Sequence, residues 1–487
     1  MAEAAIEAAV GAAARQPVVR ELSADLETPT SVYLKLAGRG PSFLLESVEG
    51  GERVARYSFI GVEPSQQYRL YPNGVERTSA AGTERLPVPE GRDTLHVLQG
   101  ELGRFQAEHL DGLPRFIGGL VGYLGYEVVR QFEPKLHPLP VSEALPEGVF
   151  LLADTLVAFD HVKRSLFLIA HAFDGDTAAA TRRLDALEAR LAGPLPQLPA
   201  VSPNGHGAVT SNLAQEEYET MVRTAKEHIA AGDIYQVVLS QRLARQSNAR
   251  PFDIYRALRR LNPSPYMFFF DFGEVGGEPF YLLGASPEMF VRLEGRRASL
   301  RPIAGTRHRG ATAAEDAALA AELLADPKER AEHVMLVDLG RNDLGRVCAY
   351  GTVKVSEFFT VEKYSHVMHI VSHVEGELRP ELTAFDLVRA SFPAGTVSGA
   401  PKVRAMEIIG TLEPGPRGPY AGAVGYFGFD GAMDTCLAIR SLVGHGRTLS
   451  VQAGAGIVAD SEPAREYEET MNKARAVLRA VEMAEAG

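Results

Sequence analysis

Short apolar runs dominate this chain, and they do not alternate regularly with helices. Between about residues 18 and 175 such runs are separated by Gly, Pro, Asn and Asp, which is the pattern of strands and turns. Similar runs return after residue 232, among them IYQVVLSQRL, YMFFFDF, AVGYFGFD and TLSVQAGAG. Regular strand–helix alternation would indicate a doubly wound parallel sheet, whereas meanders with interspersed helices predict an α+β fold built on antiparallel sheet.

A stretch rich in Pro and Gly divides the chain into two regions. The sequence AGPLPQLPAVSPNGHG has no apolar periodicity, so we interpret residues 193–212 as a linker. We therefore expect an N-terminal region over 18–192 and a C-terminal region over 213–484. Residues 1–17 form an alanine-rich arm, and the sequence leaves open whether that arm is ordered. The chain has 487 residues and 45% hydrophobic content, which is enough to bury a large core.

Two acidic pairs indicate a possible cation site. Glu329 and Glu332 follow one helix-start signal that contains proline, and Glu466 and Glu469 follow another. Carboxylates at i and i+3 leave a helix from the same face. Two such faces brought together would offer oxygen ligands to a hard divalent cation such as Mg²⁺, which takes one or two carboxylates and keeps other oxygens. The alternative for each pair is a solvated acidic helix face.

The charge of the chain limits its partners. A net charge of −12 argues against nucleic acid or an anionic membrane as the main partner, because phosphate binding needs clustered Lys and Arg. The N-terminus opens with an acidic residue, no run of eighteen apolar residues follows, and we expect a cytoplasmic protein. Cys348 and Cys436 have neither zinc-site nor disulfide spacing, which predicts buried thiols.

Six motifs follow one another in a specific order along the chain. They are LLES at 44–47, AEHVMLVDLGRND at 331–343, VMHIV at 367–371, SFPAGTVSGAPK at 391–402, LAIRS at 437–441 and QAGAGIV at 452–458. This series resembles the chorismate-utilising enzymes, and among them the family of anthranilate synthase component I, the large subunit. The resemblance implies two large antiparallel β-sheets packed as a sandwich, with helices on the outside and strands from both halves of the chain.

The resemblance also implies a magnesium-dependent reaction of chorismate. Glu332 and Glu469 match the family's metal ligands, and Glu329 and Glu466 match a supporting pair. The ion would neutralise the ring carboxylate of chorismate while a nucleophile adds at C2 and the C4 hydroxyl leaves.

Three positions match the catalytic residues of the family. Glu288 in GASPEMF matches the acid that protonates the leaving hydroxyl, and its apolar neighbours favour a raised pKa. Without the resemblance, Glu288 would be read as an ordinary strand-end carboxylate. His369 matches the acid/base residue for the loss of pyruvate, although a lone His in an apolar segment would otherwise indicate a core residue. Thr396 lies in a Gly-rich turn before the Pro401 helix, a position that can face an anion.

Other matched positions are expected to bind the substrate. Arg440 can hold the enolpyruvyl carboxylate bidentately, with Tyr420 as a hydrogen-bonding companion. Lys473 either balances the acidic cluster or forms an exposed i, i+4 pair with Glu469. The substrate-binding set is completed by Gly305, Thr306, Gly454 and Gly456. On its own, an AGAG run would indicate only a tight turn.

Two substitutions select among the relatives. Isochorismate and salicylate synthases resemble this chain but carry a water-activating Lys where it has Gln236. Aminodeoxychorismate synthases carry an attacking Lys where it has Ala304. We therefore predict ammonia as the nucleophile and anthranilate as the product, in the first committed step of tryptophan biosynthesis. The alternatives are an aminodeoxychorismate synthase component I and a catalytically dead, tryptophan-binding regulatory homologue.

Ammonia and feedback control both imply further ligands. Neither RVCAY nor DTCLA resembles the Gly-flanked nucleophile of a glutamine amidotransferase, so the resemblance implies a separate amidotransferase subunit in a hetero-oligomer, with a heterotetramer expected. It also implies inhibition by tryptophan. The matching pocket residues are Ser47, Pro263, Ser264 and Pro265, for which the alternative is a strand end and a Pro-rich turn.

Overall fold

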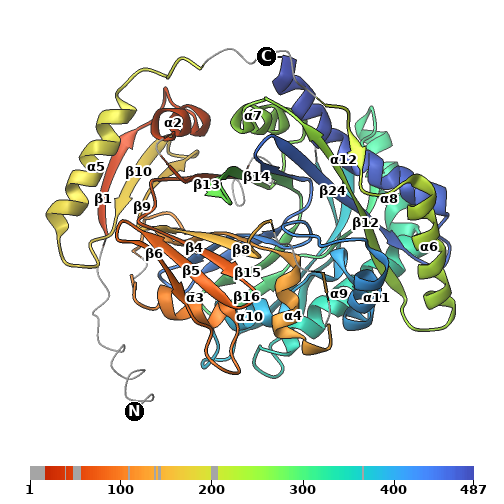
Figure 1. The fold of residues 1–487 in the computed structure, drawn as a ribbon. Coiled ribbons are helices and arrows are strands. Elements are labelled where there is room, and N and C mark those ends of the chain that lie inside the picture. Colours follow the sequence, from red (N-terminus) through yellow and green to blue (C-terminus); the bar gives the residue numbers. More distant parts are fainter. Residues whose placement is uncertain are drawn as a thin grey trace.

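Two antiparallel sheets pack face to face with helices on their outer surfaces (Figure 1). The computed structural model describes residues 17–38, 40–47, 56–107, 110–136, 139–140, 144–198, 207–364 and 367–486. The predicted α+β sandwich is therefore confirmed. The predicted arm, apart from Pro17, lies outside the described residues, as do residues 199–206 of the predicted linker.

Each sheet has twelve strands within the described residues. Sheet A has the order β1 (Val18–Ser23), β10 (Ser165–Ala170), β9 (Thr155–Asp160), β3 (Tyr57–Val62), β2 (Ser42–Glu46), β13 (Tyr266–Val275), β14 (Glu278–Ser286), β23 (Ser441–His445), β24 (Thr448–Ile457), β12 (Gln236–Gln246) and β11 (Thr210–Ser211), with β20 (Gly399–Ala400) pairing to β12. Sheet B has the order β17 (Ile303–His308), β19 (Val367–Glu377), β16 (Arg297–Leu300), β15 (Met289–Glu294), β22 (Met433–Leu437), β21 (Ala423–Gly428), β7 (Gly119–Leu124), β8 (Gly148–Ala153), β4 (Gln66–Tyr71), β5 (Gly74–Ser79) and β6 (Gly82–Leu86), with β18 (Lys354–Lys363) pairing to β19. In both sheets the strands from before the linker form one end and those from after it form the other, so the two regions of the chain share each sheet.

The helices cover the outer faces of the sheets. Over sheet A lie α2 (Pro29–Leu36), α5 (Thr177–Leu191), α6 (Gln215–Ala230), α7 (Pro251–Leu261) and α12 (Pro463–Ala486). The helix α11 (Lys402–Leu412) packs on β12 and buries its apolar residues in the same core cluster as Tyr123 and Phe272. Against sheet B lie α3 (Thr94–Leu102), α8 (Ala313–Ala325), α9 (Pro327–Gly345) and α10 (Ala384–Ser391). The remaining short elements are α4 (Val129–Phe132) and the 3₁₀ turns η1 (Tyr126–Val128), η2 (Pro134–Leu136) and η3 (Gly395–Val397).

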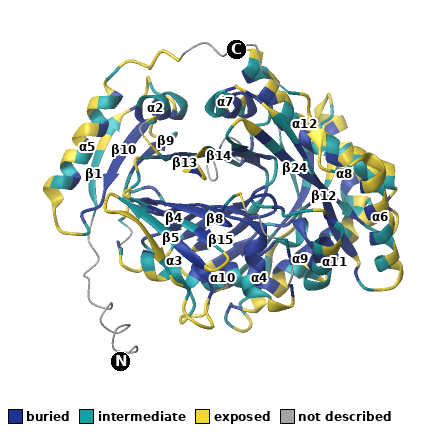
Figure 2. Ribbon diagram, viewed as in Figure 1, coloured by how far each residue is buried: buried dark blue, intermediate teal, exposed yellow. Residues whose placement is uncertain are grey.

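Alternation along the strands builds two cores. In β13 the side chains of Phe268, Phe270 and Phe272 point between the sheets, where Phe272 lies 5.6 Å from the ring of Tyr123 in sheet B. Phe269 points the other way and packs on the helix side of sheet A. Successive strand residues face opposite sides, so one aromatic strand contributes to both cores. Figure 2 shows the strands buried between the layers and exposed residues on the outer helix faces.

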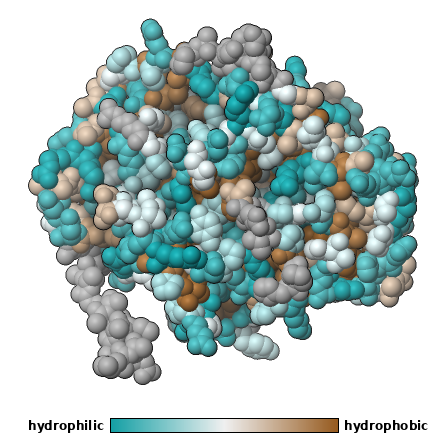
Figure 3. All heavy atoms as spheres, viewed as in Figure 1, coloured by the Kyte–Doolittle hydropathy of each residue, from teal (hydrophilic) through white to brown (hydrophobic). Residues whose placement is uncertain are grey.

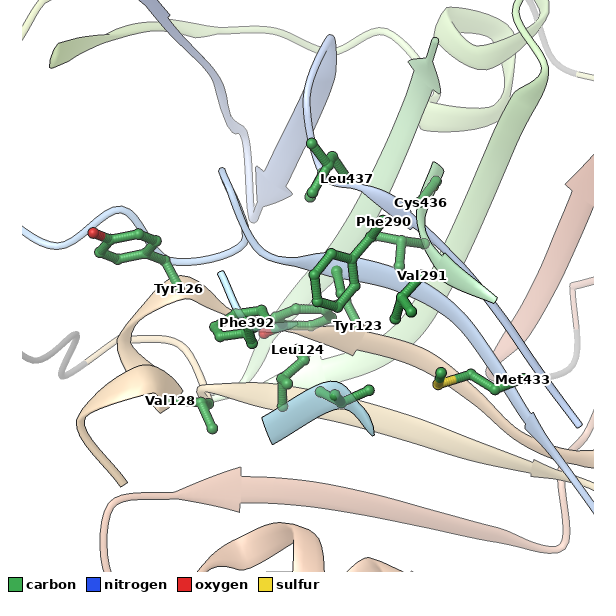
Figure 4. Packing of buried hydrophobic residues seen from close by; sticks show 14 of the residues in the cluster. Tyr123, Leu124, Tyr126, Val128, Phe290, Val291, Phe392, Met433, Cys436 and Leu437 are labelled. Atoms are coloured by element: carbon green, nitrogen blue, oxygen red, sulfur yellow. The ribbon is translucent and has the colours of Figure 1, made fainter. Parts of the chain in front are cut away.

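The core between the sheets reaches strands that carry the candidate site. Figure 4 shows Tyr123 and Leu124 of β7 packed near Phe290 and Val291 of β15, with Cys436 of β22 beyond them. Cys436 and Cys348 are buried and unpaired, as the sequence predicts.

The surface is mixed in character. On the face drawn in Figure 3, hydrophilic and apolar residues are interspersed. None of the helices in the described part of the chain combines the length and the apolar character that crossing a bilayer requires.

Candidate active site

The first acidic pair lies at the start of α9, which packs on β17 and β19. Asp326 caps this helix by accepting hydrogen bonds from the backbone N–H groups of Lys328 and Glu329 at 2.9 and 3.3 Å. Glu329 forms an ion pair with Arg307, with 3.1 Å between Oε1 and Nη1. One turn further along, Glu332 is half-buried, and burial together with the charge of Glu329 raises its pKa.

The second acidic pair lies at the start of α12, which packs on β24. Burial raises the pKa of Glu466, and the charge of Glu469 acts in the same direction. A hydrogen bond with the Ser461 side chain opposes this rise. Glu469 is exposed and forms an ion pair with Lys473, with 2.7 Å between Oε1 and Nζ. Each pair thus projects from the first turns of its helix, as the sequence predicts.

Lys473 brings the two helices into electrostatic contact. Besides pairing with Glu469, its ammonium donates a hydrogen bond to the Gly454 carbonyl at 3.0 Å. Its positive charge also partly offsets the rise in the pKa of Glu332 on α9 and of Glu288. Lys473 therefore fulfils both alternatives left open by the sequence: it balances the acidic cluster and forms the i, i+4 pair. The charge of Lys328 in the first turn of α9 likewise opposes the rise in the pKa of Glu466, so the starts of α9 and α12 lie within electrostatic reach of each other.

The carboxylates have the chemistry of a hard-cation site. Among the described residues, no three His, Cys, Asp or Glu side chains lie close enough to enclose an ion by themselves. The neighbouring charges that raise the pKa values of Glu332 and Glu466 nevertheless concentrate negative charge, which a cation would neutralise. Mg²⁺ commonly takes one or two protein carboxylates and completes its shell with water and ligand oxygens. The donor set fits such an ion.

Glu288 is a buried acid between β14 and β15. Its side chain is 9% exposed, and burial raises its pKa to about 8. The Thr396 hydroxyl donates a hydrogen bond of 2.8 Å to Glu288 Oε1. Thr396 lies in η3 and is directed at this acid, whereas the following helix α11 begins only at Lys402. Burial thus acts on Glu288 in the direction that its apolar neighbours predict, and a pKa of about 8 keeps the carboxyl mainly protonated at neutral pH.

His369 lies on β19 opposite a bulge in β17. The pairing of the two strands shifts register between Ala304 and Thr306, and Gly305 has a φ of 66° in the left-handed region that favours glycine. The Gly305 carbonyl lies 2.9 Å from His369 Nδ1, and the Thr306 hydroxyl lies 3.1 Å from it. A carbonyl only accepts, so Nδ1 carries the proton and Nε2 keeps its lone pair. Burial lowers the pKa of His369, which favours the neutral ring.

Arg440 and Tyr420 lie beside the Gly-rich strand β24. Arg440 has a φ of 51°, a strained backbone conformation of the kind found at functional sites. Its side chain lines an open pocket of about 330 Å³ together with Arg465, Glu468, Glu469, Asn472 and Lys473. A Cβ at Gly454 would stand 2.7 Å from the Tyr420 hydroxyl and 2.9 Å from the backbone carbonyl oxygen of Leu239, so this position needs glycine. The structure thus brings Arg440, Tyr420, Gly454 and Lys473 together.

Two residues of the site were not assigned to it from sequence. Gln236 was used only to choose between relatives, but it is buried next to Gly456 and forms a hydrogen bond with Glu332. Its Oε1 has no hydrogen-bond partner within the described residues. Arg307 ion-pairs with Glu322, Asp326 and Glu329 and so fixes the start of α9. The only sequence signal for Arg307 was its place next to Thr306.

The predicted tryptophan-pocket residues are brought together by strand pairing. β2 pairs with β13 so that Glu46 lies opposite Met267, and Ser47 therefore lies near the turn that leads into β13. Ser47 and Pro265 line one cavity of about 40 Å³, together with Tyr57, Phe59, Arg115, Tyr266, Asp434 and other residues of the two sheets. Pro263 and Ser264 precede Pro265 in the same turn, where the Ser264 hydroxyl donates to the Asn262 carbonyl at 3.3 Å.

Comparison with known proteins identifies the class. Residues 40–479 match the family model of chorismate binding enzymes, so the chain belongs to this family and is an enzyme of it. Anthranilate synthase component 1 of Thermus thermophilus is 50% identical to it over 473 residues, which cover 97% of this chain and 99% of that protein. The component 1 of Synechocystis is 48% identical, with 96% of each chain covered.

Solved structures agree with this class. Anthranilate synthase component I from Streptococcus pneumoniae superposes with a TM-score of 0.78 at 36% identity, covering 94% of this chain and 98% of that one. The menaquinone-specific isochorismate synthase from Escherichia coli shares the fold, with a TM-score of 0.70 at 20% identity and 98% of each chain covered.

Proposed function

We propose that this chain is the large subunit of an anthranilate synthase, which converts chorismate and ammonia to anthranilate and pyruvate. The observation that carries the proposal is Glu288, a buried and largely protonated acid held by Thr396 within reach of the charge of Lys473. The two relatives at 48–50% identity are both named anthranilate synthase component 1. This agreement supports the reaction class on grounds independent of the geometry.

The first step needs a proton at the leaving group. Ammonia adds to C2 of the ring, the ring double bonds shift, and the C4–O bond breaks. Hydroxide is a poor leaving group, so Glu288 donates its proton and water departs. The nitrogen that has added to C2 is now an ammonium group with one surplus proton. It loses this proton to solvent or to the Glu288 carboxylate, and the charges are then balanced. Thr396 keeps the carboxyl oriented through its hydrogen bond to Oε1.

The second step needs a base. His369 Nε2 removes the proton from C2, the C3–O bond breaks, and the ring becomes aromatic. The departing enolpyruvate takes up a proton to give pyruvate. The hydrogen bond from Nδ1 to the Gly305 carbonyl holds the ring in the tautomer that this role requires. We assign Arg440 and Tyr420 to binding the enolpyruvyl carboxylate. Gly454 and Gly456 would line the pocket with their backbone.

Mg²⁺ is the proposed cofactor. Glu332 and Glu469 would hold it, with Glu329 and Glu466 in support, and when bound it would neutralise the ring carboxylate of chorismate. Gln236 contacts Glu332 through its neutral amide. Because an amide is not a base, Gln236 cannot activate water as a nucleophile.

Ammonia is proposed to come from a separate glutamine amidotransferase subunit in a cytoplasmic hetero-oligomer. The designation component 1 in the relatives' names supports a second component. Free ammonium at high concentration should replace that partner in vitro.

The reaction is tested with the isolated chain, chorismate, ammonium and Mg²⁺. We expect the fluorescence of anthranilate to rise in proportion to enzyme, and chromatography to show anthranilate and pyruvate in equal amounts. Aminodeoxychorismate as the product would identify the other amination reaction of the family. No Mg²⁺-dependent turnover, with tryptophan binding retained in calorimetry, would indicate the regulatory homologue.

Tryptophan is proposed to inhibit the enzyme from the cavity lined by Ser47 and Pro265. We expect Ser47→Ala to raise the tryptophan concentration for half-inhibition about tenfold, because one hydrogen bond to a charged amino acid group is lost. Turnover without tryptophan should stay unchanged, since Ser47 is not assigned to the chorismate site. Unaltered inhibition in this variant would place the inhibitor elsewhere.

A further inference from the structure

A buried ion pair connects α9 with α11 behind the candidate acid. Lys402 Nζ donates hydrogen bonds of 2.8 and 2.9 Å to the two carboxylate oxygens of Asp343. Asp343 is 7% exposed and the Lys402 side chain 14%. Replacing such a pair by apolar residues of similar volume is often neutral or stabilising, because burying two charges is costly. Stability alone therefore does not account for this pair.

The same ammonium holds the segment that carries Thr396. Lys402 Nζ donates a third hydrogen bond, of 2.8 Å, to the Ser391 carbonyl at the C-terminal end of α10. On the other side of the segment, Arg417 Nη1 donates to the Val397 carbonyl at 2.7 Å. Residues 392–396 are thus clamped between two cations, and each cation has its own carboxylate partner, Asp343 or Glu413. The clamp fixes where Thr396 can stand.

The clamped segment packs directly against β15, the strand that begins one residue after Glu288. Phe392 meets Phe290 edge to face, with 5.8 Å between ring centroids, and the two rings are seen together in Figure 4. A cavity of about 40 Å³ lies between α9, β15 and this segment, and it is bordered by Glu288 and Thr396 as well as by Asp343 and Ser391. Asp343, one member of the ion pair, and the acid Glu288 therefore line the same small cavity.

We propose that Asp343 and Lys402 are positioning residues for the acid: by fixing the Ser391 carbonyl, they hold Thr396 in contact with Glu288. This inference rests on the proposed function, because it concerns the same protonation step. Neither residue lines the open pocket of Arg440 and Lys473; both act through the backbone of residues 391–396. A shift of the segment would misorient the carboxyl toward the leaving hydroxyl, and a displacement of about 1 Å can cost a hundredfold in rate.

The test is the double variant Asp343→Leu with Lys402→Met, assayed with chorismate, ammonium and Mg²⁺. We expect kcat to fall about tenfold to a hundredfold, with KM for chorismate unchanged within about threefold because uniform binding is untouched. The melting temperature should stay within a few degrees of the wild-type value. Arg404→Met removes an ion pair with Asp233 two residues further along α11 and serves as the matched control, with kcat unchanged.

Coupling to Thr396 separates positioning from a general structural role. In a Thr396→Val background the contact with Glu288 is already lost, so the double substitution should change kcat by no more than about twofold. An equal loss in both backgrounds, an unchanged kcat, or a change confined to KM would overturn the proposal. If the double variant melts far below the wild type, the same comparison is made with Asp343→Asn, which keeps the volume of the side chain. Its effect on kcat is measured in the wild-type and Thr396→Val backgrounds. A wild-type enzyme that forms no anthranilate would instead refute the proposed function.

Discussion

Glu288→Gln is expected to lower kcat for anthranilate formation by about a hundred- to ten-thousandfold, the range for loss of a general acid. Glutamine keeps the size of the side chain and can accept the Thr396 hydrogen bond, but it cannot give a proton to the leaving hydroxyl. Burial and the 2.8 Å contact with Thr396 make this carboxyl a prepared proton donor. Steady-state fluorescence with ammonium as the nitrogen source measures the effect, and a near-normal rate would exclude Glu288 as the acid.

The pH dependence gives an independent check on the same residue. The wild type should lose activity as the pH rises through about 8, because the Glu288 carboxyl then ionises. The folded-state pKa lies above the ordinary value of 4.5, so the folded chain holds a proton that the unfolded chain releases. The protonated Glu288 carboxyl therefore contributes to the free energy of unfolding of the wild type in full below pH 4.5, and this contribution is lost as the pH rises to about 8. Melting curves of Glu288→Gln should lack this decline.

Glu332→Ala and Glu469→Ala are each expected to remove most of the activity while leaving the fold largely intact. Glu332 is half-buried with a raised pKa, and Glu469 is exposed on α12, so neither contributes to the apolar core. With either carboxylate absent, Mg²⁺ would lose one of its two proposed ligands, and turnover should fall steeply at all practical Mg²⁺ concentrations. A Mg²⁺ titration of the anthranilate rate measures the loss.

Exposed acids on the same helices provide the controls. Asp338 on α9 pairs with Arg341, and Glu482 on α12 pairs with Arg479, both at the surface. Alanine at either position should leave the rate and its Mg²⁺ dependence unchanged. Wild-type turnover in Glu332→Ala or Glu469→Ala, with these controls also active, would show that the metal ligands are other residues.

Local signals were sufficient for the elements that carry the acidic pairs. Asp326 caps α9, and prolines stand at the first position of both α9 and α12, because caps and first-turn prolines act within a few residues. Ser461 does not cap α12 through a backbone N–H of that helix: its hydroxyl accepts a hydrogen bond from the Val458 N–H, which lies before the helix. Several helices were not identified from sequence. Among them, α8 is largely alanine and leucine, and α10 is only eight residues long.

Long-range pairing decided the rest. No local pattern shows that β2 lies beside β13, or that the two sides of the linker share both sheets, since these contacts join residues more than two hundred positions apart. The contact of Thr396 with Glu288 spans 108 positions.

The sequence by itself determined the fold class, the two acidic helix starts and, through its ordered motifs, the family. Those properties depend on neighbouring residues and on the identity of side chains at fixed spacing. Only the tertiary structure decided which groups meet: Lys473 within electrostatic reach of Glu332 and Glu288, His369 on the Gly305 carbonyl, and Lys402 on Asp343. Burial, which sets the protonation of Glu288, exists only once the distant strands have packed.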